Sequence, residues 1–73
     1  MFVNVSFLEK NNKIKVKNIQ EASREYCRYR DNKGFCASQM SKGNGNITEN
    51  SVTIARISYN GRAWDLENNP IDI

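Results

Sequence analysis

The stretch Val52-Thr-Ile-Ala-Arg-Ile-Ser-Tyr-Asn-Gly-Arg-Ala-Trp-Asp-Leu66 decides the fold of the C-terminal half of the chain. Strand-forming residues lie on both sides of the pair Asn60-Gly61. Both positions of a two-residue hairpin turn need a positive φ, which Asn and Gly tolerate better than other residues. The stretch therefore predicts a β-hairpin with a two-residue turn at Asn60-Gly61.

This turn fixes an expected register. It places Ser58 opposite Ala63, Ile57 opposite Trp64, and Ala55 opposite Leu66. Alternate residues of a strand share a face, so we expect one face to pack on the core. This face consists of Ala55, Ile57, Trp64 and Leu66. Arg56 and Asp65 then share the outward face, where they can form an ion pair.

The N-terminal residues predict a second hairpin. Residues 2–8 alternate between apolar and polar side chains, and residues 13–17 read Lys-Ile-Lys-Val-Lys. Each pattern is typical of a half-buried strand, with Ile14 and Val16 pointing inward. The polar residues 9–12 form the expected link between the two strands.

A helix follows the first hairpin. Asn18 is a good N-cap residue, and Glu21 stands at the spacing of a capping box. We expect the helix to run from about Ile19 to about Asp31 and to end before Gly34, which can adopt the left-handed conformation. Its expected buried stripe is Ile19, Ala22, Tyr26, and either Cys27 or Tyr29.

The remaining segments complete an α+β domain. Residues 36–46 contain Gly43-Asn-Gly-Asn46 and predict a loose loop, while Ile47-Thr48 begins a short strand. Residues 1–66 form the expected domain, with a ββαββ(β) order and one helix on one face of an antiparallel sheet. Residues 67–73 form an extended, partly mobile tail.

Size and composition limit the function. A chain of 73 residues forms at most one domain with a small core, so function on the outer surface is favoured over a deep substrate pocket. The N-terminal residues do not resemble a secretory signal, and no stretch approaches the roughly 20 apolar residues of a membrane helix. We therefore expect a cytoplasmic protein. Cys27 and Cys36 are then expected as thiols, although a disulfide between them is geometrically conceivable.

The residue types argue against an enzyme. The chain has no His, which removes the usual general base and the commonest zinc ligand, and two Cys do not complete a zinc site. None of the carboxylates lies in an apolar run that would raise its pKa for acid–base catalysis. Gly43-x-Gly45 lacks the Lys-Ser/Thr of a phosphate-binding loop. We expect no cofactor, no metal and no small-molecule substrate.

Positive charge is concentrated in one third of the chain, since residues 10–33 carry eight Lys or Arg against three acids. Lys13, Lys15 and Lys17 project from one strand face about 6.6 Å apart, close to the spacing of nucleic-acid phosphates. Arg24 and Arg28 lie one helical turn apart and extend this basic zone if the helix adjoins it. Alternatively, the lysines block strand pairing with other chains, and the arginines pair with Glu21 and Glu25.

Three residues around the predicted turn are further candidates for partner binding. Arg56 lies on the outward face, and Tyr59 and Arg62 flank Asn60-Gly61. An exposed aromatic beside an Arg can stack on a base or anchor a protein contact. The alternative is structural, with Tyr59 covering the edge of Trp64.

Three segments resemble a group of small bacterial proteins encoded on plasmids, phages and integrated elements. They are Glu21-Ala22-Ser23, Gly34-Phe-Cys-Ala-Ser38, and Ala55-Arg-Ile-Ser-Tyr-Asn-Gly-Arg-Ala-Trp64. The hairpin segment is the most specific part, and Cys36 departs from the group at a position where a second Gly is expected. The resemblance covers residues 20–65 and implies a mobile genetic element as the source. It brings no catalytic or ligand residues with it.

Three functions follow as hypotheses. The first is a non-enzymatic binding protein that acts on a host protein or nucleoprotein complex, as an anti-CRISPR or other anti-defence inhibitor does. The second is direct binding of nucleic acid by the basic strand and helix. The third is a structural accessory module that associates through the exposed strand face at Val52 and Ile54.

Overall fold

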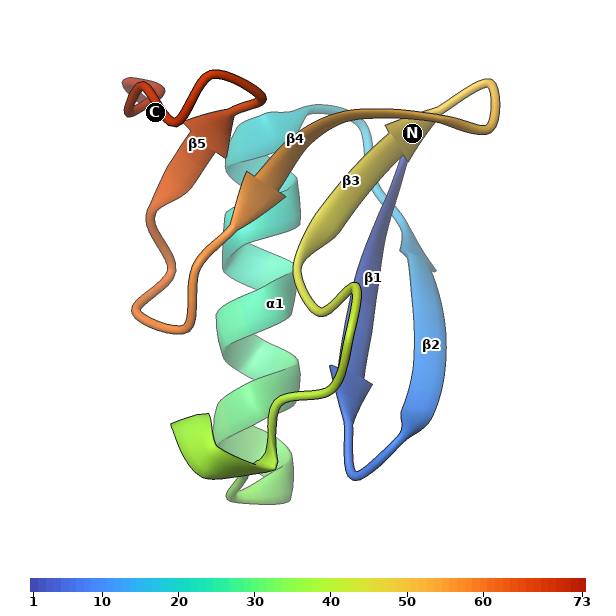
Figure 1. Ribbon diagram of the computed structural model, residues 1–73, viewed down its shortest axis with the longest axis vertical. Helices are drawn as coiled ribbons and strands as arrows, with labels where there is room; N and C mark the ends of the chain where they lie inside the picture. The colour runs from blue at the N-terminus through green and yellow to red at the C-terminus, as the bar shows by residue number, and fades with distance from the viewer.

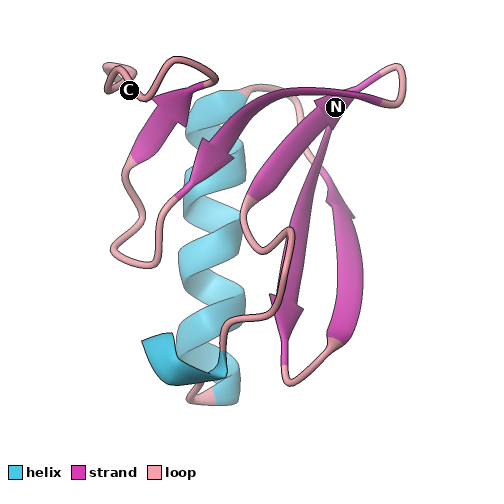
Figure 2. Ribbon diagram, viewed as in Figure 1, coloured by secondary structure: helices cyan, strands magenta, loops and turns pink.

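A computed structural model of residues 1–73 shows one helix packed on a five-stranded sheet. The elements are β1 (Phe2–Phe7), β2 (Lys10–Lys15), α1 (Ile19–Lys33), the 3₁₀ helix η1 (Ala37–Gln39), β3 (Asn46–Glu49), β4 (Val52–Ile57) and β5 (Ala63–Asp65). The strand order is β2-β1-β3-β4-β5, and all neighbours are antiparallel. In Figure 1, α1 lies behind the sheet, and Figure 2 shows the same two layers. The α+β class and the helix on one face are confirmed.

The core lies between α1 and the sheet. Val3, Val5 and Phe7 of β1 are at most 1% exposed, as the alternation of this strand predicts. They meet Ala22 and Tyr26, the fully buried residues of the helix. The other buried apolar residues of this cluster are Val16, Ile47, Ala55, Ile57 and Ala63. Phe35, which follows the end of the helix, stacks its ring on Phe7 with centroids 4.6 Å apart.

The helix ends are capped as the sequence predicts. The side chain of Asn18 accepts a hydrogen bond from the backbone N–H of Glu21 at 2.8 Å. The Glu21 carboxylate accepts from the N–H of Lys17 at 3.3 Å, so it bonds the residue before the cap and not Asn18 itself as a capping box would. Gly34 closes the helix with a φ of 69°, the left-handed conformation that glycine adopts without a steric penalty. The helix runs two residues past the expected end, to Lys33.

The first hairpin turns earlier than expected. Phe7 pairs with Lys10, so the turn consists of Leu8 and Glu9, with φ values of 52° and 63°. The strand β2 therefore spans residues 10–15 rather than 13–17. Both turn residues adopt the positive φ of a two-residue hairpin turn although neither is Gly, Asn or Asp, the residues that signal such a turn.

The last hairpin differs from the prediction by one residue. Ile57 pairs with Ala63, Arg56 with Trp64, and Ala55 with Asp65. The reason is the turn. Ser58 N–H donates to the Arg62 carbonyl, Gly61 N–H donates to the Ser58 carbonyl, and of the central residues only Gly61 has a positive φ. This is a three-residue loop with a glycine bulge.

A one-residue shift in register exchanges the two faces of a strand. Ala63 is therefore buried against the helix, while Trp64 lies on the opposite face beside Arg56. The prediction that Trp64 and Leu66 build the core is wrong, and Leu66 is 65% exposed. Arg56 donates to Asn68 and not to Asp65, which alternates to the other face.

The segment between η1 and β3 is more ordered than its glycines suggest. β1 pairs with β3 only at Phe2 and Val3. Farther along β1, the loop takes the place of a strand, because Gly45, Ser41 and Gln39 exchange backbone hydrogen bonds with Asn4, Ser6 and Leu8. The Gly45 carbonyl also accepts from Ile57, so this residue joins β1 to β4.

Residues 67–73 turn back along β5. The N–H groups of Glu67 and Asn69 donate to the Asp65 carboxylate, at 2.8 and 2.9 Å. Ile71 N–H then donates to the Ala63 carbonyl at 2.9 Å. The segment expected to be an extended tail therefore shields the outer edge of the sheet, and Ile71 packs against the core.

Candidate binding site on the open face of the sheet

The helix leaves one side of the sheet uncovered, and we name this side the open face. Side chains of successive strand residues point to opposite sides, so residues between the buried positions define it. The open face includes Phe2 and Asn4 of β1, Lys13 and Lys15 of β2, Asn46 and Thr48 of β3, Thr53 and Arg56 of β4, and Trp64 of β5. Ser6 and Asn11 share this side, but Ser6 is fully buried. It is turned toward the viewer in Figure 1.

Strand register aligns two groups of residues on the open face. Lys13 pairs with Asn4 in the first group, and Arg56 pairs with both Asn46 and Trp64 in the second. Asn4 and Asn46 are not paired in register, but their amide nitrogens lie 3.3 and 3.8 Å from the position that a Cβ on Gly43 would take. Lys15 pairs with Phe2, which is 40% exposed. The acidic strand residues Glu49 and Asp65 alternate to the helix side, so the strand positions of the open face carry only neutral and basic side chains.

Trp64 is the centre of a cationic cluster. The guanidinium carbon of Arg56 lies 5.4 Å from the centroid of the indole ring, and that of Arg62 lies 5.8 Å from it. Both distances are within the range of cation–π attraction. The indole Nε1–H donates to the Ser58 hydroxyl at 3.1 Å, which orients the ring toward the turn. The cluster combines an aromatic surface with two planar cations.

The two arginines of this cluster are held differently. Arg56 is half-buried, and its Nη2 donates to the Asn68 side chain at 3.1 Å. Arg62 is exposed, and its guanidinium forms no hydrogen bond or ion pair. Arg62 is therefore free to leave the indole for another anion or aromatic group, while Arg56 stays in place.

The structure divides the predicted site residues between two sides of the molecule. Lys13 and Lys15 belong to the open face, with Arg56 and Arg62 at its far end. Arg24 and Arg28 are exposed on α1, on the side opposite its buried residues. Only one of the two expected ion pairs of these arginines is present, between Arg28 and Glu25 at 3.8 Å. The helix does not extend the basic zone of the lysines.

Two other predicted site residues lie apart from the open face. Lys17 is exposed in the connection to α1. Tyr59 packs on the helix side, where the guanidinium of Arg30 lies 5.0 Å from its ring centroid and its hydroxyl donates to the Phe35 carbonyl at 2.8 Å. Arg30 also donates to the Tyr59 carbonyl. These contacts join the turn to the helix, and they replace the predicted packing of Tyr59 over the edge of Trp64.

Two aromatic residues of the open face are not among the candidates that the sequence predicts. Phe2 is predicted only as a strand residue, and Trp64 as a core residue. For Phe2 the signal exists, because Val3, Val5 and Phe7 fix the buried face and leave Phe2 on the other. For Trp64 no pattern separates a two-residue from a three-residue loop at Asn60-Gly61.

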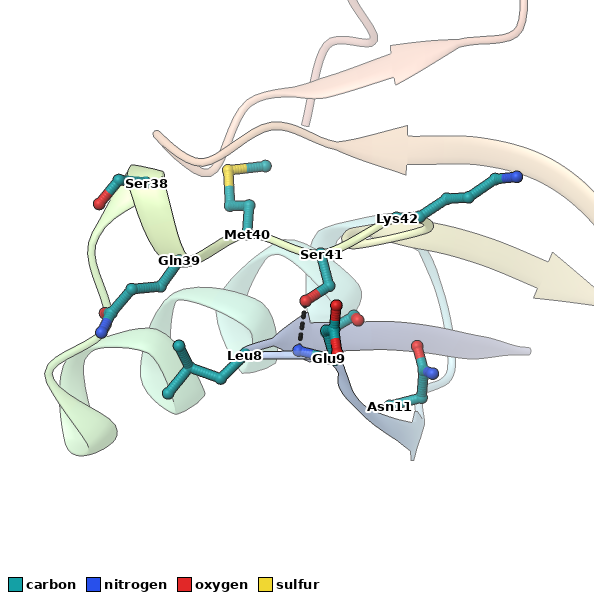
Figure 3. A pocket seen from close by; sticks show the side chains of 9 residues that line it. Leu8, Glu9, Asn11, Ser38, Gln39, Met40, Ser41 and Lys42 are labelled. Atoms are coloured by element: carbon teal, nitrogen blue, oxygen red, sulfur yellow. Dashed lines mark hydrogen bonds between the residues drawn. The ribbon is translucent and has the colours of Figure 1, made fainter.

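The depression beside the first hairpin has fewer convergent functional groups than the open face. Between the first hairpin and residues 38–42 lies an open depression of about 530 Å³, shown in Figure 3. Its side chains diverge, since Ser38 and Gln39 point to one side and Lys42 to the other. No three potential metal ligands of the His, Cys, Asp or Glu type gather anywhere in the chain.

The two cysteines are free thiols. Cys27 is half-buried on the helix, and Cys36 is exposed before η1. A hydrogen bond with the Ser38 hydroxyl lowers the pKa of the Cys36 thiol. Burial raises the pKa of Tyr26, whose hydroxyl accepts a hydrogen bond from the Asn44 side chain at 2.6 Å.

The fold and the site define a small α+β domain with an uncovered, basic and aromatic sheet face. No protein-family model, curated protein or solved structure matches the chain. None of its helices has the length and apolar character needed to cross a bilayer.

Proposed function

We propose that this chain is a non-enzymatic binding protein whose open face contacts a nucleic acid, free or within a nucleoprotein complex. The observation that carries the proposal is the cluster of Arg56, Arg62 and Trp64 on the same uncovered face as Lys13 and Lys15. Basic side chains attract phosphates, and aromatic and guanidinium groups stack on bases. Both kinds of group point away from the helix.

The charges of the open face support this assignment. Lys13 and Lys15 are exposed and carry no ion pair, so their charge is available to a polyanion. The face also lacks a long apolar stripe, because the polar residues Asn46 and Thr48 of β3 separate Phe2 from Trp64. An apolar centre is typical of protein–protein interfaces, and the open face has a polar one. These features favour nucleic acid over a purely protein partner.

The proposed setting follows from the resemblance of residues 20–65 to proteins of plasmids and phages. Host defence complexes against such elements contain guide or target nucleic acid, and a small protein with a basic sheet face can bind there. In this proposal the anti-CRISPR or anti-defence activity is a consequence of binding, and no covalent chemistry is required.

Binding of fluorescently labelled DNA, followed by anisotropy at several salt concentrations, tests the proposal. We expect binding that weakens as salt rises, because phosphate contacts release counterions. The double substitution K13E/K15E should abolish it. The matched control R24E/R28E makes the same change in net charge on the helix side and should retain most of the affinity. Absence of binding to both single-stranded and duplex DNA at low salt would refute the proposal.

A further inference from the structure

We propose that the nucleic acid bound by the open face is single-stranded, and that Trp64 stacks on one of its bases at the position which the Arg62 guanidinium now occupies. This inference rests on the proposed function and names its ligand class. Three features of the structure support it: the breadth of the sheet, the position of Trp64 on it, and the different anchoring of the two arginines.

The breadth of the sheet argues against reading a duplex. Four intervals of about 4.8 Å separate β2 from β5, so the open face is about 19 Å across the strands. The major groove of B-DNA is about 12 Å wide and admits a helix or a two-stranded ribbon. A five-stranded face therefore meets a duplex only at its phosphates. A single strand, in contrast, lies across such a sheet with its bases turned toward it.

The position of Trp64 matters because base faces are accessible only in single strands. In a duplex each base is covered by its neighbours, so an indole on a flat sheet finds no partner. Trp64 lies at the β5 end of the open face beside Arg56, and Lys13 lies at the β2 end beside Asn4. A nucleic-acid strand that crosses the sheet between these ends meets a cation for its phosphates and a ring for a base.

The arginines explain how the ring becomes available. Arg56 is anchored by Asn68 and supports the indole. Arg62 touches the ring without any other side-chain partner. We infer that Arg62 moves from the indole to a phosphate when a base arrives, so that the cation–π contact is exchanged for a base stack and an ion pair.

The test uses the fluorescence of Trp64, which is the only Trp in the chain. The unmodified protein is titrated with oligothymidylate, and separately with a duplex of equal nucleotide number. We expect oligothymidylate to quench the indole emission and to bind about tenfold or more tightly than the duplex, the size of effect that one stacked base produces. The duplex should leave the emission nearly unchanged.

Substitutions separate stacking from charge. W64A should lower the affinity for labelled oligothymidylate about tenfold or more and leave duplex affinity within about twofold. W64Y keeps an aromatic ring and should recover most of the affinity that W64A loses. If Trp64 only supported the sheet, the affinity would not depend on an aromatic ring at this position. K13Q/K15Q should lower the affinity for both ligands and reduce the salt dependence of binding. R24Q/R28Q should change neither the affinities nor the salt dependence.

The outcomes distinguish this inference from the proposed function. If both ligands bind equally, the emission does not change and W64A binds normally, then the open face binds nucleic acid through phosphates alone and the inference is overturned. If neither ligand binds at low salt, both proposals are wrong. Circular dichroism of W64A and W64Y confirms that a loss of binding is not a loss of fold.

Discussion

Arg56 and Trp64 face each other across β4 and β5, with the guanidinium carbon 5.4 Å from the centroid of the indole ring. The pair exists because three residues, Tyr59 to Gly61, form the loop between the strands. A two-residue loop would have turned Trp64 toward the helix. The same loop is fixed from the helix side, where Ser23 donates to the Gly61 carbonyl at 2.5 Å. The turn thus decides whether the single Trp is a core residue or a surface residue.

Replacement of Trp64 by Ala should have a modest effect on stability. Trp64 is half-buried on the open face, and we expect the free energy of unfolding to fall by about 1–2 kcal/mol, a typical value for such a site. Phe7→Ala is the comparison, because Phe7 is 1% exposed and should cost about 3–5 kcal/mol. Urea denaturation followed by circular dichroism measures both. Equal losses for the two variants would show that Trp64 belongs to the core.

Gly45→Ala should be among the most damaging substitutions in the chain. The residue has a φ of 82°, and an added Cβ would overlap the backbone carbonyl of Ile57. We expect a loss of about 3 kcal/mol or more, the range of the largest single-site effects. Gly34→Ala is the matched control, since its φ is 69° and nothing lies within 4 Å of its Cβ position.

Gly34→Ala should cost about 1–2 kcal/mol, the penalty for a left-handed residue with a Cβ. The difference between the two variants isolates the close approach of Gly45 to β4. Thermal unfolding of both variants provides the measurement. A Gly45→Ala protein as stable as Gly34→Ala would mean that the loop moves away from β4 without cost.

Ser51→Gly should stabilise the protein. Asn50 and Ser51 form the turn between β3 and β4, with φ values of 52° and 66°. The substitution creates the preferred Asn-Gly pair and removes the left-handed penalty of a serine. We expect a gain of about 0.5–1 kcal/mol, because the greater freedom of Gly in the unfolded chain offsets part of the benefit. A lower melting temperature would contradict this account of the turn.

The C-terminal segment should detach in acid. Hydrogen bonds from the backbone N–H groups of Asn69 and then Glu67 lower the pKa of Asp65 below its usual range. A depressed carboxyl pKa stabilises the folded chain above the unfolded pKa of about 3.9, and this contribution is lost as the pH falls through the folded pKa. Amide NMR signals of Glu67 and Asn69 should therefore shift below about pH 4.

The control for this pH dependence is Asp65→Asn, which cannot ionise. In this variant the two amide signals should no longer respond as the pH falls from neutral through the acid range in which the protein stays folded. If the wild-type signals respond to falling pH no more than those of Asp65→Asn, down to the pH at which the protein unfolds, the Asp65 carboxylate does not hold the segment in place.

The sequence predicts the elements of the fold better than their connections. Period-two alternation identifies the buried face of β1, and Asn18 with Gly34 marks the ends of α1, because these signals are local. The turn at Leu8-Glu9 has no such signal. Its two residues adopt positive φ values because Val3 and Val5 must face the core in register with β2, and tertiary packing overrides their local preference.

The candidate site illustrates the same limit. Lys13 and Lys15 are identified from the alternation of their strand, and the structure places them on the side away from the helix. Arg24 and Arg28 are also identified as exposed, but a linear sequence does not say that they lie on the other side of the molecule. Trp64 joins the site only through the one-residue difference in loop length, which local residue preferences do not encode.

The place of β1 in the sheet also has a consequence for synthesis. β1 leaves the ribosome before the other four strands, yet it lies between β2 and β3, and Phe2 pairs with Thr48. The first hairpin and α1 can form early, but their apolar side stays incompletely covered until β3 and β4 arrive. A nascent chain that stops within the loop of residues 40–45 therefore has no closed core. A protein truncated there should be degraded by proteases and should not fold into a smaller binding domain.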